Sequence, residues 1–491
     1  MLLREGSLPL RDFYSVYGPA QYAVSAVLYT LFGEELLVSR LADAAVFGAA
    51  GALIFACVHR LADVRAALFA VLAFTAMAVM AHPSANYPAV SALPLFLGAA
   101  LFFGSWIETG RMRTLVIAGL CIGLVGALRW DFGVFGVAAL GLSTLAVTWP
   151  RRRIRPPGPA LAAALVPALL LAGAVYVPLL SGHAAQWVDE VPKFLTLEFA
   201  SWRNKAFLRP TVWAIENGVR RTDIPALGDA VMSLVLAVLP FAVLPLAAWR
   251  AVRAVLDAGE PLDRASGIAL LLSLVGLCLL NQMRVRPGLW QGFPAIAIAF
   301  VLLPWAARLP AFLRKPARLA AGLGLVLLCL VAIDQQRRWW SMKDEALASP
   351  RASAIRLPGA GWPGYAALVA HVRATTSPTE PIFSGVTDTS RLFINDALLY
   401  FLAARRPATR FMEMEPGLTN TERGQREIVA DLERQQVRSV VLWHITSDEP
   451  NRTSSSNGVT LLDDHIRSHF TQTHRFGAYS VLVRRAPGVR P

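Results

Sequence analysis

Charged residues are scarce in this sequence. Asp, Glu, Lys and Arg together make up 16% of the 491 residues, whereas hydrophobic residues make up 55%. Soluble globular proteins carry roughly 25% charged residues, and the mean hydropathy of this chain is +0.48. The balance excludes an ordinary soluble enzyme and predicts an α-helical protein that crosses a membrane many times.

Lysine, paired cysteines and a leader-like start are also lacking. Lysine occurs four times, so the net charge of +14 comes mostly from arginine. The arginines lie between apolar runs, which is typical of membrane topology signals and does not favour a nucleic-acid partner. The four cysteines lie inside apolar runs without paired spacing, which predicts neither a disulfide framework nor a Cys-x-x-Cys metal site. Residues 1–15 show no basic segment followed by an apolar one, so no cleavable signal peptide is expected.

Long apolar runs dominate the first two thirds of the chain. Windows of about 17 to 25 residues are long enough to cross a hydrocarbon core of roughly 30 Å as helices. The sequence contains ten such windows, which cover approximately 38–59, 65–81, 87–107, 112–128, 131–148, 160–180, 229–250, 265–281, 287–306 and 317–334. A shorter apolar segment at 19–32 begins with Pro19 and has helical spacing of its apolar residues, so we expect a helix that lies in the membrane interface.

The basic residues predict the orientation of these spans. The turns after the odd-numbered spans contain fifteen Arg and Lys residues, whereas the alternate short turns contain three and the long loop at 181–228 adds six. The positive-inside rule therefore places the first set in the cytoplasm. Residues 1–37, the loop at 181–228 and the chain after 335 are then expected outside. The abundance of Ala, Arg, Gly and Pro suggests a bacterial source, which would make this side the periplasm of a multi-pass inner-membrane protein.

The tail differs in character from the spans. We expect residues 1–37 to form an outer loop with the interfacial helix, 38–340 the membrane domain, and 341–491 a small α/β domain. Strands are predicted at 381–386, 439–445 and 479–485, with an amphipathic helix after a capping-box pattern at Thr419 and Glu422. Asp388, Asn395 and Asp396 are interpreted as caps rather than catalytic groups.

Polar residues gather at the predicted outer ends of spans that are far apart in sequence. Asp131 stands out because ionisable groups near a membrane are costly and often serve a function. It is interpreted either as a carboxylate that deprotonates an acceptor or holds a cation, or as a solvated turn residue paired with Arg129. Arg40 and Asp43 are expected to form an ion pair within one helix.

Two arginines lie in a short turn on the predicted outer side, where basic residues are otherwise few. Arg284 and Arg286 suit a phosphate group, although headgroup anchoring explains them as well. The full set of candidate binding residues is Tyr17, Asn86, Tyr87, Arg129, Arg203, Arg284 and Arg286.

Two stretches resemble a known superfamily. The order G-x-L-P-x-R-D-F, Y-G-P, Y, L-F-G, L and R-L near the start, together with "GLVGALRWDFGVF" at 123–135, is similar to the GT-C superfamily of polytopic glycosyltransferases. The resemblance implies inverting transfer of a sugar from a polyprenyl-phosphate donor to a glycan, lipid or protein acceptor on the outer face. It also implies a carboxylate base, with arginines or a divalent metal balancing the phosphate leaving group.

The resemblance also raises a difficulty. In relatives, a transmembrane helix that carries an acidic residue at its outer end precedes the first loop. Glu5 and Asp12 lie downstream of that position. We therefore expect either a start assigned too late or a truncated chain with altered chemistry, and Asp12 is the second catalytic candidate beside Asp131. A transporter or flippase of lipid-linked substrates, and a non-catalytic relative, remain alternatives.

Overall fold

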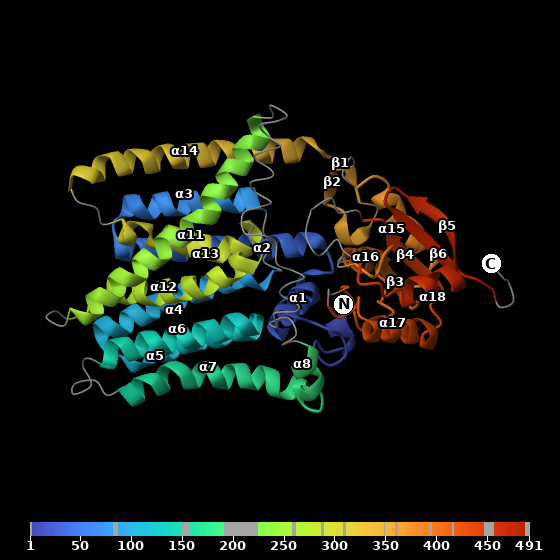
Figure 1. Ribbon diagram of the computed structural model, residues 1–491, viewed down its shortest axis with the longest axis horizontal. Coiled ribbons are helices and arrows are strands. Elements are labelled where there is room, and N and C mark those ends of the chain that lie inside the picture. Colours follow the sequence, from blue (N-terminus) through green and yellow to red (C-terminus); the bar gives the residue numbers. More distant parts are fainter. Residues whose placement is uncertain are drawn as a thin grey trace.

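The computed structural model has a bundle of long helices at one end and an α/β domain at the other (Figure 1). The structure describes residues 2–81, 87–149, 157–190, 224–257, 262–285, 289–307, 311–347, 349–358, 362–391, 395–414, 417–445 and 456–486. The expected fold class, a polytopic helical membrane protein with a small C-terminal α/β domain, is confirmed.

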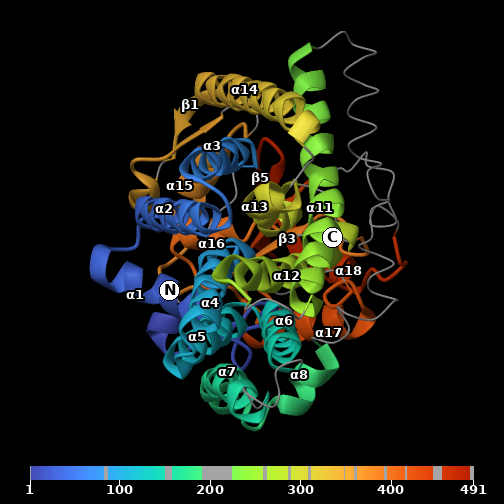
Figure 2. The same cartoon turned by 90° about the vertical axis from the view of Figure 1, so that its left-hand side faces the viewer.

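All ten expected spans are helices. Within the described residues, nine helices are long and apolar enough to cross a membrane, and α5 is a shorter apolar helix of 17 residues. The bounds are α2 (Leu36–Leu61), α3 (Val64–Ala81), α4 (Pro88–Thr109), α5 (Met112–Leu128), α6 (Trp130–Thr148), α7 (Pro157–Leu180), α11 (Ile224–Leu256), α12 (Arg264–Val285), α13 (Leu289–Ala306) and α14 (Ala311–Ser341). Viewed from its far end, the bundle surrounds α4, α12 and α13 (Figure 2), whose windows are about 70% buried.

Two spans are longer than their apolar runs. Helix α11 has 33 residues and α14 has 31, or roughly 45 to 50 Å at 1.5 Å per residue, which exceeds the hydrocarbon core. In α14 the excess is the polar segment at 334–341, which continues the helix to the α/β domain because Gln and Arg are good helix formers.

The basic turns lie at one end of the bundle. The turns from α2 to α3 and from α4 to α5 both lie at the end away from the α/β domain (Figure 1). They carry Arg60, Arg65, Arg111 and Arg113. The first residues, the short helix α8 (Ala184–Glu190) and the α/β domain all lie at the opposite end.

The α/β domain is built on a four-stranded sheet. Its order is β3 (Ile382–Val386), β4 (Ser439–Trp443), β6 (Tyr479–Arg484) and β5 (Phe470–Phe476), with β3 and β4 parallel and the other pairs antiparallel. Side chains alternate along strands, so each strand contributes to a core on either face. One core holds α17 (Glu422–Arg434) and α18 (Leu461–His469), and the other holds α15 (Tyr365–Thr375) and α16 (Leu398–Ala403). A two-stranded sheet of β1 (Lys343–Ala346) and β2 (Arg356–Pro358) joins α14 to this domain.

Three predicted strands are present, but β1, β2 and β5 were missed. Strand β5 is one of the two edge strands of the four-stranded sheet, and its middle residues are polar and exposed, so it lacks the apolar alternation that marks a strand in the sequence. The capping box was also wrong. Thr421, not Thr419, is the N-cap of α17, since its hydroxyl accepts a hydrogen bond from the backbone N–H of Gly424.

The three polar residues interpreted as caps all hold local backbone. Asp396 accepts hydrogen bonds from the N–H groups of Leu398 and Leu399 at the start of α16. Asp388 holds a turn through the N–H of Ser390. Asn395 connects β3 to the segment at Met414 by donating to the carbonyl of Ser384 and accepting from the N–H of Met414.

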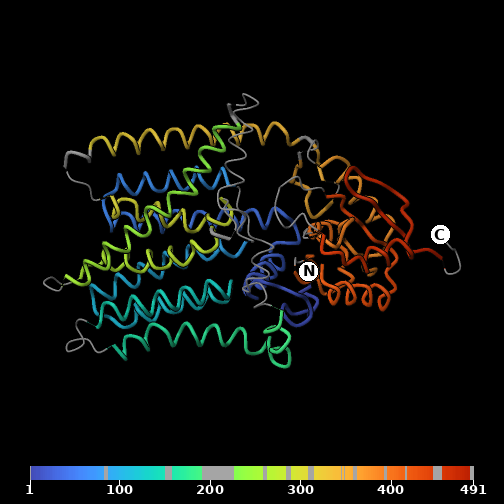
Figure 3. Tube along the Cα trace, viewed as in Figure 1, coloured from blue at the N-terminus to red at the C-terminus, as the bar shows by residue number. Residues whose placement is uncertain are grey.

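The N-terminal segment packs against the α/β domain (Figure 3). The backbone N–H of Tyr14 donates to the carbonyl of Arg410 at 2.9 Å, and the Tyr14 side chain belongs to the core that holds α17. Arg410 also forms an ion pair at 2.7 Å with Glu190 of α8. Helix α1 (Pro19–Phe32), which has the expected bounds, contacts the domain through Tyr29 and Phe401. The core of the α/β domain is therefore completed by residues from the start of the chain.

Asp396 gives a pH-dependent prediction. Burial raises the pKa of its carboxyl above the ordinary value, so the folded chain binds this proton more tightly than the unfolded chain. The resulting stability is fully present below the unfolded pKa of about 3.9 and is lost as pH rises through the folded pKa. Asp396→Asn keeps an acceptor oxygen for the two N–H groups and has no charge. We expect its melting temperature near pH 7 to exceed that of the wild type.

The measurement is the melting temperature of the full chain in detergent between pH 4.5 and 8. Asp396→Ala is the matched control, because it removes the charge and the cap together and should melt lower at every pH. If Asp396→Asn shows the same pH dependence as the wild type, the buried carboxyl is not its source.

Candidate functional site

A one-residue turn between α5 and α6 positions Arg129 and Asp131. Helix α5 ends at Leu128 and α6 begins at Trp130, so Arg129 alone connects them in an extended conformation. The two helices can turn this sharply because Gly126 and Gly133 face each other, where a Cβ on Gly133 would lie 2.4 Å from the Cα of Gly126. The turn lies at the bundle end that faces the α/β domain (Figure 1).

Arg129 and Asp131 form a bidentate ion pair. Nε of Arg129 donates to Oδ1 of Asp131 at 2.8 Å, and Nη2 donates to Oδ2 at 3.0 Å. The side chains are 9% and 15% exposed. The pairing matches the interpretation of Asp131 as a turn residue paired with Arg129, although its carboxylate is more buried than that interpretation assumed. Bidentate pairs of this kind are strong and fix the direction of both groups.

Two further spans contribute to this pair. Nη1 of Arg129 donates to the hydroxyl of Tyr87, just before α4, at 3.0 Å. Nε2 of Gln282 on α12 donates to Oδ2 of Asp131 at 3.2 Å. Residues 87, 129, 131 and 282 therefore meet at one point, and the structure brings the predicted Tyr87, Arg129 and Asp131 together.

Aromatic rings surround the guanidinium. Its carbon lies 4.2 Å from the ring centre of Phe132, 5.6 Å from Tyr87 and 5.8 Å from Tyr17. The Tyr17 and Tyr87 rings pack edge to face at 6.0 Å. Such contacts stabilise a desolvated cation. Tyr17, also predicted from the sequence, thus joins the cluster, which we call the Arg129 cluster (Tyr17, Tyr87, Arg129, Asp131 and Gln282).

Gly18 fixes the loop before α1, residues 6–18, against this turn; we call this segment the entry loop. Its N–H donates to the carbonyl of Leu128 at 2.9 Å. A Cβ at Gly18 would lie 2.1 Å from the carbonyl oxygen of Ala127, so no larger residue fits without backbone movement. The helix-starting Pro19 follows at the N-terminus of α1. The glycine thereby sets the position of Tyr17 relative to Arg129.

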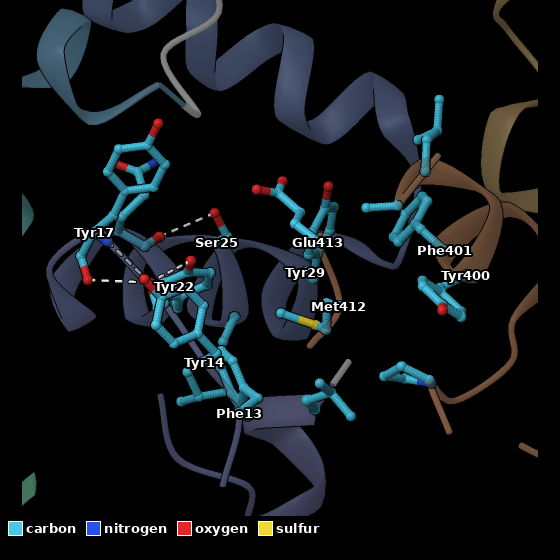
Figure 4. Close-up of a pocket in the computed structure, with 18 of the residues that line it drawn as sticks. Phe13, Tyr14, Tyr17, Tyr22, Ser25, Tyr29, Tyr400, Phe401, Met412 and Glu413 are labelled. Carbon is cyan, nitrogen blue, oxygen red and sulfur yellow. Dashed lines mark hydrogen bonds between the residues drawn. The ribbon is translucent and has the colours of Figure 1, made fainter. Parts of the chain in front are cut away.

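A cavity of about 480 Å³ adjoins the cluster between α1 and the α/β domain. Figure 4 shows Tyr14, Tyr17, Tyr22 and Tyr29 on the side of the entry loop and α1, with Phe401 and Glu413 on the side of the α/β domain. The Tyr22 hydroxyl is hydrogen-bonded to Ser15 at 2.7 Å. Tyr17 lines both the cavity and the Arg129 cluster, so a ligand in the cavity lies one side chain away from the guanidinium.

Asp12, the second catalytic candidate, lies in a different environment. Its carboxylate accepts hydrogen bonds from Arg11 and from the N–H of Leu8, and it lines a polar cavity of about 660 Å³ beside α17. The Arg11 hydrogen bond holds the pKa of the Asp12 carboxyl below its ordinary value, which makes it a poor proton acceptor. None of its described contacts reaches Asp131, so the structure does not bring the two candidates together.

Four of the predicted binding residues have side chains that the structure does not describe. Asn86, Arg203 and Arg286 lie outside the described residues, and only the helical backbone of Arg284 is described. Arg40 and Asp43 form the expected pair on α2, at 3.1 Å.

Gln282 was missed by the sequence analysis. The available signal was a pair of amides, Asn281 and Gln282, at the end of an apolar run.

Within the described residues, the side chains around Asp131 do not form a divalent-metal site, because no group of three His, Cys, Asp or Glu ligand atoms gathers there. The arrangement is suited instead to an anion, because an arginine fork can exchange its carboxylate partner for a phosphate.

Comparison with known proteins supports the resemblance seen in the sequence. Residues 18–176 match the family described as dolichyl-phosphate-mannose-protein mannosyltransferase. This segment begins at Gly18, just before α1, and contains the turn at Arg129, and the similarity to GT-C polytopic glycosyltransferases is confirmed there. A search of curated proteins finds no match to this chain.

Solved structures show more distant likenesses. An oligosaccharyltransferase, AglB from Archaeoglobus fulgidus, in complex with an inhibitory peptide and a dolichol-phosphate, is 13% identical, with a TM-score of 0.44 over 88% of this chain and 62% of that one. ArnT from Cupriavidus metallidurans bound to undecaprenyl phosphate is also 13% identical, with a TM-score of 0.46 over 100% of this chain and 92% of that one. The chain thus spans about three fifths of the length of the archaeal protein.

Proposed function

We propose that this chain, of which residues 18–176 match a mannosyltransferase family, is a membrane glycosyltransferase. It moves a hexose or pentose from a polyprenyl-phosphate donor to an acceptor hydroxyl of a glycan, lipid or protein. The observation that carries this proposal is the buried guanidinium of Arg129 beside an aromatic cavity at the end of the bundle. A lipid phosphate presents its charge at this depth, between hydrocarbon and water.

The proposed roles follow from the contacts. Arg129 turns part of its fork from Asp131 towards the phosphate of the donor, as a planar guanidinium with five N–H donors allows. This frees a lone pair on the Asp131 carboxylate, which then accepts the proton of the acceptor hydroxyl. The hydroxyl oxygen bonds to the anomeric carbon as the bond from that carbon to the phosphate oxygen breaks. Polyprenyl phosphate leaves with the electron pair, and the anomeric configuration is inverted.

The charges at the two ends of the bundle favour one orientation of the chain in the membrane. The basic turns at one bundle end support a cytoplasmic side there. We therefore infer a multi-pass protein of a bacterial inner membrane whose first 37 residues and residues 341–491 face the periplasm beside the site. Sugar transfer would then serve the cell envelope.

One observation favours a second candidate function. Asp131 accepts three hydrogen bonds from Arg129 and Gln282, which would suit a chain that binds a lipid phosphate without transferring its sugar. The two functions differ in turnover and share the binding step, so they can be separated by measuring both.

The test of the shared step is binding of undecaprenyl phosphate to the purified full chain in detergent. Arg129→Gln should weaken binding at least tenfold, because a charged hydrogen bond contributes about 1.5–3 kcal/mol. Arg40→Gln is the matched control, since Arg40 pairs with Asp43 near the same end of the bundle but is 61% exposed. Equal binding by wild type and Arg129→Gln would remove the phosphate role.

Turnover decides between the two functions. Membranes that contain the wild-type chain should release polyprenyl phosphate from polyprenyl-phosphate sugars faster than membranes without it, as measured by mass spectrometry. Binding without such release would favour the non-catalytic candidate.

A further inference from the structure

A second polar cluster lies in the α/β domain. It consists of Glu433 on α17 and His465 and His469 on α18, the two helices that share one face of the sheet (Figure 1). One ligand atom from each residue lies within 4.8 Å of the others. The histidines are four residues apart on one helix, which places both rings on the same face. Their rings stack with centres 4.3 Å apart.

His465 points an unsatisfied nitrogen at this cluster. Its side chain is nine-tenths buried, and Nε2 makes no hydrogen bond within the described part of the chain. This atom nevertheless lies 3.1 Å from Oε1 of Glu433. Buried polar atoms without a partner are rare in folded proteins. A nitrogen and a carboxylate oxygen that face each other without hydrogen-bond geometry are arranged as two ligands of one cation are.

Hydrogen bonds from neighbouring groups orient two of the three ligands, His469 and Glu433. Nδ1 of His469 lies 3.0 Å from the carbonyl oxygen of His465 and 2.9 Å from the hydroxyl of Ser468. The tautomer with its proton on Nδ1 donates to this carbonyl and has its lone pair on Nε2, which is the form that binds a metal through Nε2. Arg484 donates to both oxygens of Glu433 at 2.9 and 3.1 Å and so fixes the carboxylate. Its positive charge also opposes a dication, which predicts moderate rather than very tight binding.

We propose that Glu433, His465 and His469 bind a divalent transition metal of the zinc class, with water as the fourth ligand. Two imidazoles and one carboxylate suit zinc, whereas calcium and magnesium prefer oxygen ligands alone. A tetrahedral ion with bonds of about 2.0–2.1 Å holds its ligands roughly 3.4 Å apart. Rotation of the exposed His469 side chain can close the remaining gap. The metal clamps α17 to α18, and the site is independent of the proposed transferase activity.

The experiment measures zinc binding to the metal-free full chain in detergent by titration calorimetry, together with its melting temperature. We expect one ion per chain and a rise of several degrees in melting temperature at 100-fold excess over Kd. Cobalt should give a visible spectrum without thiolate charge-transfer bands, which distinguishes this site from the four cysteines.

His469→Asn is the decisive variant, because the exposed side chain can be changed without disturbing the core. It should weaken zinc binding at least tenfold and remove the thermal shift, as should Glu433→Gln. The double variant His371→Asn/His474→Asn is the matched control, because these two rings also lie close together, with centres 4.2 Å apart, but are outside the three-ligand group. Wild-type affinity in His469→Asn, or no stoichiometric zinc binding by the wild type, would overturn the proposal.

Discussion

Asp131→Asn is expected to lower the rate of sugar transfer about 10²- to 10⁴-fold, the range that a general base contributes. The amide has the same shape as the carboxylate but cannot take a proton from an acceptor hydroxyl. It also leaves Arg129 without its charged partner at a position where both side chains are mostly buried, and breaking a buried pair costs about 3–5 kcal/mol. The readout is polyprenyl phosphate released by membranes that contain equal amounts of folded chain.

Two further variants separate catalysis from positioning. Asp43→Asn is the matched control, because Asp43 also pairs with an arginine at the same bundle end, and its transfer rate should stay near that of the wild type. Gln282→Ala removes only one hydrogen bond to Asp131 and should change the rate less than tenfold. If Asp131→Asn transfers sugar at the wild-type rate, Asp131 is a structural partner of Arg129 and the proposed base must be another group.

Gly18→Ala is expected to have the second largest effect, although it adds a single methyl group. The new Cβ would lie 2.1 Å from the carbonyl oxygen of Ala127, so the entry loop must move by roughly an ångström to reach ordinary contact. A displacement of about 1 Å can cost 10²-fold in rate when it moves groups at a reacting centre. The loop also carries Tyr17, which packs on Tyr87 and Arg129. We expect transfer to fall by about 10²-fold and the melting temperature to decrease.

A glycine in open space provides the control for this substitution. No heavy atom lies within 4 Å of a Cβ built at Gly51 on α2, so Gly51→Ala should preserve both transfer and melting temperature. The backbone at Gly18 has φ −69°, which any residue can adopt, so the expected loss arises from lack of space. Near-normal transfer by Gly18→Ala would mean that the entry loop does not position the site.

The candidate site was predictable in part. Arg129 and Asp131 stood out because charges between two apolar runs are unusual, and both lie in the Arg129 cluster with Tyr17 and Tyr87. Gln282 was missed, because a pair of uncharged amides at the end of a span is only a weak signal until α12 is packed beside α6. Asp12 was grouped with Asp131 on its sequence context, yet it lies beside α17, since the loop folds back onto the α/β domain.

The sequence by itself determined the ten helices of the bundle, the helix at Pro19–Phe32, three strands and the shared end of the termini. These features depend on the length and period of apolar runs and on the placement of arginine, all of which are local. Only the tertiary structure decided that Arg129 binds Asp131 and Tyr87 together, that Tyr14 completes the core of the α/β domain, and that Glu433 meets His465. Such contacts depend on how each helix is rotated about its axis and where it crosses its neighbours. Packing between distant segments sets both quantities.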